Sequence, residues 1–270
     1  MSAEHLAVPD SPRLALLVLG GSSGRVEAER AEVLAAHGIA ALAVPWFGAD
    51  GLPPSPRRVP LEVFGPHLAR LAGLAPRVGV VGTSFGAEAA LLLGVLYPGL
   101  SLVAALAPTA VAWQTPDTDD AGHPVRDAKW TWGGEPVAGM ENVDQHVAGP
   151  FDEARSWNDA SLAACQDLSP YAIPVERIRA TVLLSAGGDD RVWDSARACR
   201  DIAGRRAAAG RATHAVSHPL AGHRAVLPGE GPAPDRPGFP RGGTPEADAQ
   251  HGEAILASLL QLAPGREERR

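Results

Sequence analysis

The sequence predicts an α/β protein with a mostly parallel central sheet and helices on both of its faces. Two observations predict this fold class. Strand-like apolar runs alternate with helix-like stretches along most of the chain, and 45% of the 270 residues are hydrophobic, which is ample for a core. A chain of this length is expected to form one large domain, and we assign residues 1–270 to it.

Proline and glycine mark several ends of the expected elements. Gly38 closes the first helix, Pro45 ends the second strand, and Pro60 suits the first turn of the second helix. The expected strands are residues 14–19, 39–44, 77–81, 100–106, 180–185 and 212–217, and the expected helices are residues 26–37, 60–73, 87–96, 194–209 and 247–262.

A Gly-x-Ser-x-Gly motif marks the turn after the third predicted strand. The chain reads Gly82-Thr-Ser-Phe-Gly86 between an apolar run and a helix-like stretch. This pattern is typical of the nucleophile elbow of an α/β-hydrolase fold, where the serine is strained and the glycines let strand and helix close together. The five letters also occur by chance in Gly/Ser-rich turns, so the strand and helix around them carry the prediction. We predict that Ser84 is a catalytic nucleophile.

An acid and a histidine follow later strands in the order that this fold requires, which is serine, aspartate, histidine. Asp189 and Asp190 come just after the fifth predicted strand, and His223 follows the sixth. His223 would be the general base that takes the Ser84 proton, and the aspartate would hold its tautomer and stabilise the imidazolium. We favour Asp190, because G-x-x-D after the strand is the more usual placement, and Asp189 stays the alternative.

A tetrahedral intermediate needs preorganised N–H donors for its negative oxygen. We expect one from the backbone of Phe85, the residue after the nucleophile, and another from the glycine-rich loop 20–24, at Gly21 or Ser22. The alternative interpretation of this loop is a phosphate-binding turn. Neither G-x-G-x-x-G nor G-x-x-x-x-G-K-[ST] occurs there, which favours the oxyanion hole.

The alternation of strands and helices stops between residues 108 and 174. This stretch is rich in Gly, Pro, Asp and Trp, and so long a segment without regular elements is usually functional or disordered. Its tryptophans argue against disorder, so we predict a lid inserted within the domain. The alternative is an irregular surface excursion that its aromatic residues hold in place. The tryptophans expected at the substrate pocket are Trp113, Trp130, Trp132 and Trp193.

The composition narrows the classes of partner. A formal net charge of −7 without a basic stripe argues against nucleic acid. No cluster of His, Cys, Asp or Glu has a metal-ligand spacing, and we expect neither a metal nor a cofactor. The start of the chain lacks a basic n-region and an apolar run long enough for a membrane span, which predicts a cytoplasmic protein. We expect its partner to be a small-molecule substrate. Lys129 is the only lysine, and we interpret the preference for arginine as codon usage.

These motifs together resemble the C-terminal domain of the bile-acid-CoA:amino acid N-acyltransferase and acyl-CoA thioesterase family, an α/β-hydrolase branch close to the dienelactone hydrolases. Glu88, four residues after the predicted nucleophile, is typical of the family, and we expect it to bond backbone near the elbow. Family members usually have Lys or Arg directly after the nucleophile, where this chain has Phe85. The resemblance covers about residues 13–262, and the stretches that carry it are 20–24, 60–64, 82–88, 173–178, 185–193 and 242–247.

The resemblance implies a triad of Ser84, Asp190 and His223 that acts on an acyl thioester, bound to CoA or to a carrier, through an acyl-enzyme. We predict hydrolysis of such a thioester or of a related activated ester. The family's amino acid-conjugating members use cysteine as the nucleophile, whereas a serine oxygen ester leaves water competitive with amines. The alternatives are an acyltransferase that uses an amine or hydroxyl acceptor, and a carboxylesterase or lactonase of the dienelactone hydrolase type.

Overall fold

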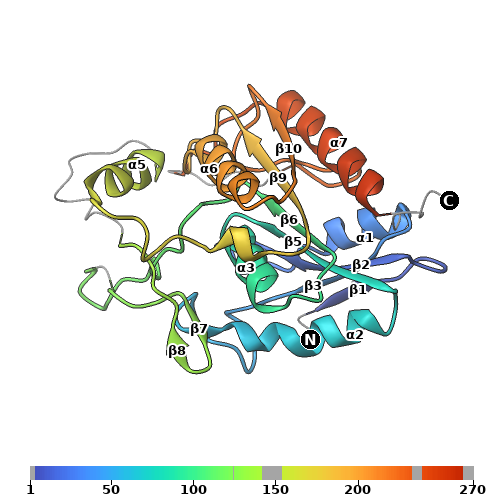
Figure 1. Ribbon diagram of the computed structural model, residues 1–270, viewed down its shortest axis with the longest axis horizontal. Helices are drawn as coiled ribbons and strands as arrows, with labels where there is room; N and C mark the ends of the chain where they lie inside the picture. Colours follow the sequence, from blue (N-terminus) through green and yellow to red (C-terminus); the bar gives the residue numbers. More distant parts are fainter. Residues whose placement is uncertain (1–3, 124, 142–153, 233–238, 264–270) are drawn as a thin grey trace.

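A seven-stranded sheet lies at the centre of the protein, with helices on both faces (Figure 1). The computed structural model describes residues 4–123, 125–141, 154–232 and 239–263. The strand order is β1-β3-β2-β5-β6-β9-β10, and each neighbouring pair is parallel except β1 with β3. The predicted α/β fold class is confirmed. The strands are β1 (His5–Ala7), β2 (Leu14–Leu19), β3 (Ala40–Val44), β5 (Arg77–Thr83), β6 (Leu102–Leu106), β9 (Thr181–Gly187) and β10 (Thr213–His218).

Helices pack on both faces of this sheet because its inner strands are apolar on both sides. Along β2, Leu17 and Leu19 join the core under one set of helices, whereas Leu16 and Val18 join the core on the other face. The first face carries α2 (Gly65–Ala72), α3 (Phe85–Leu96) and α6 (Ser195–Ala208), and the second carries α1 (Ala28–Ala36) and α7 (Pro245–Leu262).

Capping residues fix where two of these helices begin. The side chain of Asp194 accepts a hydrogen bond from the backbone N–H of Arg197 at 2.9 Å, so α6 begins at the next residue. Thr244 caps α7 in the same way, and Pro245 occupies the first helical position, where its missing N–H costs nothing. These local signals explain why the predicted bounds of both helices lie close to the observed ones.

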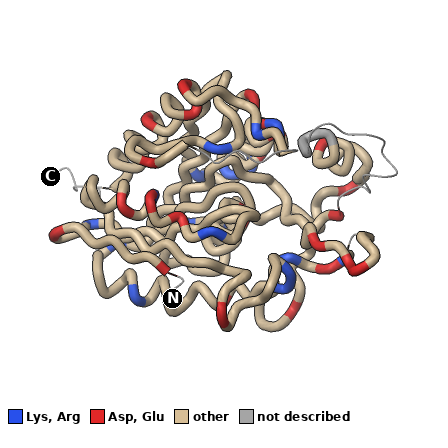
Figure 2. Tube along the Cα trace, turned by 180° about the vertical axis from the view of Figure 1, so that it is seen from behind, with Lys and Arg blue, Asp and Glu red and all other residues tan. Residues whose placement is uncertain are grey.

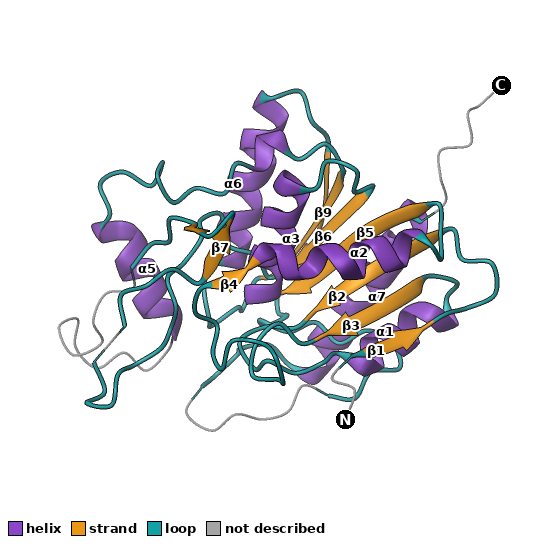
Figure 3. Ribbon diagram, turned by 90° about the horizontal axis from the view of Figure 1, so that it is seen from below, coloured by secondary structure: helices purple, strands orange, loops and turns teal. Residues whose placement is uncertain are grey.

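The segment 108–174 contains regular elements that the sequence did not predict. It lies at one end of the molecule, on the left in Figures 1 and 3, and residues 142–153 of the predicted lid fall outside the described residues. The second predicted helix begins as a single 3₁₀ turn. Within the segment lie β7 (Trp130–Trp132), β8 (Glu135–Pro136) and α5 (Ala154–Ala164). Outside it lie β4 (Val59–Pro60), which forms a small sheet with β7 and β8, and the 3₁₀ turns η1 (Leu61–Phe64) and η2 (Val175–Arg177).

Charged residues are interspersed along the described trace (Figure 2). Within that part of the chain, no helix combines the length and the apolar character that a membrane crossing needs. The same residues include no group of three or more His, Cys, Asp or Glu side chains placed to hold a metal ion.

Candidate active site

The backbone turns sharply at Ser84, between the end of β5 and the start of α3. Ser84 has φ 61° and ψ −120°, a conformation that side-chain-bearing residues rarely adopt. Two glycines make the turn possible, since a Cβ on Gly82 would collide with the carbonyl of Gly86, and one on Gly86 with the carbonyl of Leu19. The motif thus folds as a strand, a strained serine and a helix.

Ser84, His223 and Asp190 form a continuous chain of hydrogen bonds. His223 Nε2 lies 2.9 Å from Ser84 Oγ, and His223 Nδ1 lies 2.9 Å from Asp190 Oδ2 and 3.0 Å from Asp190 Oδ1. All three side chains are buried. They follow β5, β9 and β10, whose carboxyl ends lie along one edge of the parallel sheet, where α/β proteins bind their ligands.

The two adjacent aspartates after β9 have different partners. Asp190 Oδ1 also accepts hydrogen bonds from the backbone N–H groups of Val192 and Trp193, at 2.9 and 3.3 Å. Asp189 instead accepts the backbone N–H of Gly243 at 2.8 Å and bonds the side chain of Arg191 at 3.2 Å. The carboxylate beside the imidazole is therefore that of Asp190.

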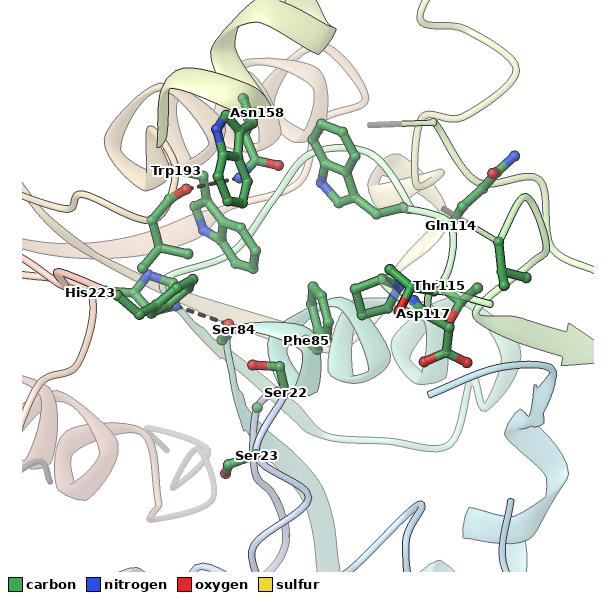
Figure 4. Close-up of a pocket in the computed structure, with 18 of the residues that line it drawn as sticks. Ser22, Ser23, Ser84, Phe85, Gln114, Thr115, Asp117, Asn158, Trp193 and His223 are labelled. Atoms are coloured by element: carbon green, nitrogen blue, oxygen red, sulfur yellow. Dashed lines mark hydrogen bonds between the residues drawn. The ribbon is translucent and has the colours of Figure 1, made fainter. Parts of the chain in front are cut away.

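The expected oxyanion-hole residues border Ser84 from two sides. A Cβ on Gly21 would lie 3.1 Å from Ser84 Cβ and 3.5 Å from Ser84 Oγ, so this loop runs directly beside the hydroxyl. Phe85 is the first residue of α3, and the leading N–H groups of a helix have no acceptor within it. Gly21, Ser22 and Phe85 all line the cavity beside Ser84. Figure 4 shows Ser22 and Phe85 next to Ser84.

A cavity of about 690 Å³ opens over Ser84, a volume typical of small-molecule sites. In Figure 4, Trp193 lies on the same side of the cavity as His223, and Thr115 lies beyond Phe85. One part of the wall is therefore aromatic and another polar. The aromatic lining residues are Phe85, Trp113, Trp157, Trp193 and Phe239, and the polar ones include Gln114, Thr115 and Asp117.

Two of the four tryptophans expected at the pocket line it, namely Trp113 and Trp193. Two other aromatic residues that line the cavity, Trp157 of α5 and Phe239, were not predicted from the sequence. Trp157 falls in the predicted lid segment and could have been included on the same grounds as its neighbours. Phe239 lies in a Pro/Gly-rich loop, where no periodicity marks a pocket residue.

The other two expected pocket residues, Trp130 and Trp132, are not among those that line the cavity. Trp130 is buried, its ring lies 4.7 Å from that of Trp46, and its Nε1 donates to Glu88 at 2.7 Å. Trp132 is 37% exposed, and its ring meets Tyr97 edge-on at 5.8 Å. Both residues belong to β7, and because β7 pairs with β4, they lie in the small sheet and not at the cavity.

Two ion pairs, one buried and one partly buried, connect the loops around the site, and neither was predicted. Arg30 donates to Glu230 at 2.6 and 2.9 Å and to Thr83 Oγ1, directly before the elbow serine, at 2.7 Å. Arg224, the residue after the site histidine, donates to Glu27 at 3.0 and 2.6 Å. Burial alone would raise the pKa of Glu27, but the hydrogen bonds and charge of Arg224 lower it overall.

Glu88 joins α3 to the segment 108–174. Its carboxylate is fully buried and accepts hydrogen bonds from the side chains of Lys129 and Trp130 and from the backbone N–H of Trp113, at 2.8, 2.7 and 3.2 Å. The expected backbone bond is present. The two side-chain donors come from residues more than 40 positions away, a pairing that no local pattern indicates.

Solved structures with the same fold include enzymes of the α/β-hydrolase class. A Klebsiella pneumoniae protein assigned as a dienelactone hydrolase is 16% identical, with a TM-score of 0.55 over 93% of this chain and 88% of its own. A monoacylglycerol lipase from Paleococcus ferrophilus is also 16% identical, with a TM-score of 0.55 over 96% of this chain and 98% of its own. At these identities the likeness shows the fold alone.

Curated relatives match at higher identity over part of their length. Acyl-coenzyme A thioesterase 1 of Rattus norvegicus is 26% identical over 219 residues, which are 77% of this chain and 48% of the relative. Acyl-coenzyme A amino acid N-acyltransferase 2 of Mus musculus is 27% identical over 217 residues, 77% of this chain and 48% of the relative. The chain spans about half the length of these relatives.

The family model described as "BAAT / Acyl-CoA thioester hydrolase C terminal" matches residues 67–230. This stretch includes Ser84, Asp190 and His223 together with β5, β6, β9 and β10. With an α/β-hydrolase fold around the match, the chain belongs to the BAAT / acyl-CoA thioester hydrolase C-terminal family.

Proposed function

We propose that this protein is a serine hydrolase that cleaves an acyl thioester, or a related activated ester, through an acyl-enzyme. The observation that carries the proposal is the hydrogen-bonded chain of Ser84, His223 and Asp190 at a cavity large enough for an acyl group. The thioesterases among the relatives support a thioester as substrate. The acyl group can be presented on CoA or on a carrier.

In the first half-reaction Ser84 Oγ attacks the thioester carbonyl. His223 Nε2 takes the Ser84 proton, and Asp190 holds the Nδ1–H of the imidazole and stabilises the positive charge that forms. The backbone N–H of Phe85, with one from Gly21 or Ser22, binds the negative oxygen of the tetrahedral intermediate. The carbon–sulfur bond breaks, and His223 returns the proton to the departing thiol.

In the second half-reaction a water molecule attacks the acyl-Ser84 ester. His223 takes a proton from the water, and the same N–H donors bind the negative oxygen again. The ester bond breaks, Ser84 Oγ regains a proton from His223, and the free acid leaves. Hydrolysis is favoured because an oxygen ester is less reactive toward amines than the thioester that a cysteine nucleophile would form.

The segment 108–174 acts in this proposal as an inserted lid of one domain that spans residues 1–270. Trp113 and Trp157 from this segment line the cavity, which supports a role in shaping the acyl pocket. Two hydrogen bonds from Trp113 and Trp130 to Glu88 of α3 support a fixed connection between this segment and the elbow.

The second candidate is an acyltransferase that passes the acyl group to an amine or hydroxyl. The relative named as an amino acid N-acyltransferase favours it. The same acyl-enzyme serves both reactions, and the acceptor that reaches it decides the product. A pocket that binds an amine and excludes water would favour transfer.

A panel of acyl thioesters tests the proposal, supplied with and without millimolar glycine, taurine and simple alcohols. We expect free acid as the main product under all conditions, and intact-protein mass spectrometry should find the acyl group on Ser84. Amide or ester as the main product would instead establish the transferase. A fluorophosphonate probe, with Ser84→Ala as the control, reports the nucleophile independently of the substrate chosen.

A further inference from the structure

The only lysine of the chain is buried beside the elbow. Lys129 directly precedes β7 and has no exposed surface, and its Nζ lies 2.8 Å from Glu88 Oε2, which is equally buried. Burial lowers the pKa of Lys129, and the carboxylate of Glu88 opposes this effect. The carboxylate of Glu88 therefore supports the charged form of Lys129 inside the protein.

The ammonium group also lies against an aromatic ring of the site. Lys129 Nζ is 3.4 Å from the centroid of the Phe85 ring, a close cation–π contact. Phe85 lines the cavity, directly follows Ser84 and begins α3. The contact thus acts on the residue whose N–H we assign to the oxyanion hole.

An aromatic row continues from Phe85 to the imidazole. The Phe85 ring stacks on Trp193 with centroids 5.9 Å apart and planes 24° apart, and Trp193 meets the His223 ring edge-on at 4.9 Å. Trp193 is fixed at its other end because its Nε1 donates to the carbonyl of Ala107 at 3.1 Å. The row therefore runs without a break from the buried ammonium to the general base.

A buried ion pair commonly adds little to the free energy of unfolding. Removing both charges from water costs more than their attraction commonly returns, and well-packed apolar residues of similar size often stabilise a core as well. What this pair supplies is a fixed geometry, since Lys129 Nζ bonds Glu88 and contacts the Phe85 ring. Glu88 is itself held by the side chain of Trp130 and the backbone N–H of Trp113.

We propose that Lys129, held by Glu88, is a positioning residue that acts through Phe85 on the Ser84 site. Its ammonium fixes the Phe85 ring, and the ring fixes both the start of α3 and the aromatic row that ends on His223. The inference rests on the proposed function for the roles of Ser84 and His223. It adds a residue that touches neither the substrate nor the nucleophile.

A double-mutant cycle tests the proposal. Lys129→Met removes the charge but keeps a long apolar side chain, and Phe85→Leu removes the ring but keeps the backbone N–H. We expect Lys129→Met to lower kcat, and the rate of Ser84 labelling by a fluorophosphonate, by about 10- to 100-fold, the range that small misplacements of catalytic groups cost. KM for a short acyl thioester should change less than about threefold, because ground-state binding is not what the ammonium controls.

The effect of Lys129→Met in the Phe85→Leu protein distinguishes a positioning role from a purely structural one. In the Phe85→Leu protein, Lys129→Met should lower the same rates less than about threefold, because the ring that transmits the effect is gone. An equal loss in both backgrounds would overturn the proposal, because a structural defect does not depend on Phe85. A loss below threefold already in the wild-type background would overturn it too.

Lys129→Met leaves the Glu88 carboxylate buried without its partner charge, which can unfold the protein. A second variant without either charge is the control. Glu88→Gln combined with Lys129→Met removes both charges and keeps an acceptor for Trp130. We expect this protein to retain its melting temperature but to stay slow, and to show the same dependence on the Phe85 background. Wild-type rates in this variant would refute positioning. A wild-type chain labelled at Ser84 that hydrolyses no thioester would refute only the proposed substrate class.

Discussion

The carboxylate beside His223 contacts the imidazole with both of its oxygens. Asp190 bonds Nδ1 with both oxygens and also accepts two backbone N–H groups, so its own position is fixed from several directions. Asp189, one residue earlier, is partly exposed and bonds Gly243 and Arg191. One step along the chain therefore separates the carboxylate that bonds the imidazole from the one that bonds Gly243 and Arg191.

We predict opposite outcomes for the matched substitutions of these two residues. Asp190→Asn should lower kcat by roughly 10⁴-fold, because the amide favours the wrong tautomer of His223. Asp189→Asn should lower kcat less than about tenfold, since the carboxylate that bonds His223 is that of Asp190, whereas Asp189 bonds Gly243 and Arg191. Steady-state kinetics on one acyl thioester measures both, and Ser84→Ala provides the background rate. The reverse ranking would show that Asp189 orients the base.

The sequence distinguished these residues only partly. Ser84 and His223 follow strands at positions that local patterns indicate, so their location was predictable. The choice between Asp189 and Asp190 rested on the position after the strand at which this fold usually places the acid. Phe239 and the partners of Glu88 come from distant parts of the chain, and their approach depends on packing that periodicity does not encode.

At the scale of elements, the junction of β5 and α3 is too tight for side chains. Gly82→Ala should lower the free energy of unfolding by more than about 2 kcal/mol, because the new Cβ would collide with the backbone of Gly86. Gly204→Ala, in the interior of α6 with nothing within 4 Å of the added Cβ, should raise it by about 0.5–1 kcal/mol. Urea denaturation measures both. Equal effects would mean that the elbow can relax.

The part of α5 that borders the cavity should set acyl preference. Trp157 is half-buried and lines the cavity, so Trp157→Ala should raise kcat/KM for long or bulky acyl groups relative to acetyl by about tenfold or more. Trp132→Ala is the control, because Trp132 lies outside the cavity lining. A chain-length series of one thioester measures both variants. An unchanged profile in Trp157→Ala would contradict the proposed lid.

The helices and long strands were predictable because each is marked by a pattern in its own stretch of sequence. Buried apolar runs, a glycine after a helix and a proline or cap before one are local, and the observed α6 and α7 begin within two residues of the expected positions. The small sheet was not predictable. It pairs β4 with β7, two strands of two and three residues that lie about 70 positions apart, and such short strands have no pattern to detect.

At the scale of the whole molecule, a buried histidine couples stability to pH. His251 on α7 is 2% exposed and bonds Ser185 of β9 at 3.1 Å. Burial lowers the pKa of His251 below its ordinary value of 6.5, although the carbonyl of Val216 opposes the shift. The unfolded chain therefore binds a proton near pH 6.5 that the folded protein binds only at lower pH.

The sign of this effect follows from proton linkage. Below pH 6.5 the unfolded state binds more protons at this site, so the free energy of unfolding should fall as the pH is lowered from 7.5 to 5.5. His251→Asn keeps a polar partner for Ser185 and removes the titration. We expect its stability to change less over the same range, as measured by urea denaturation. A slope equal to that of the wild type would place the coupling elsewhere.

The burial of the single lysine has a consequence for proteolysis. A lysine-specific protease can cut this chain only after Lys129, and that bond becomes accessible only when the protein around Glu88 opens. When opening and closing are fast, the rate of this one cleavage reports the population of the open form. We expect the native protein to resist such a protease. Added urea should increase the population of the open form, and the two fragments should then accumulate faster. Cleavage after Lys129 thus measures, without any added label, how often the region around Lys129 and Glu88 opens.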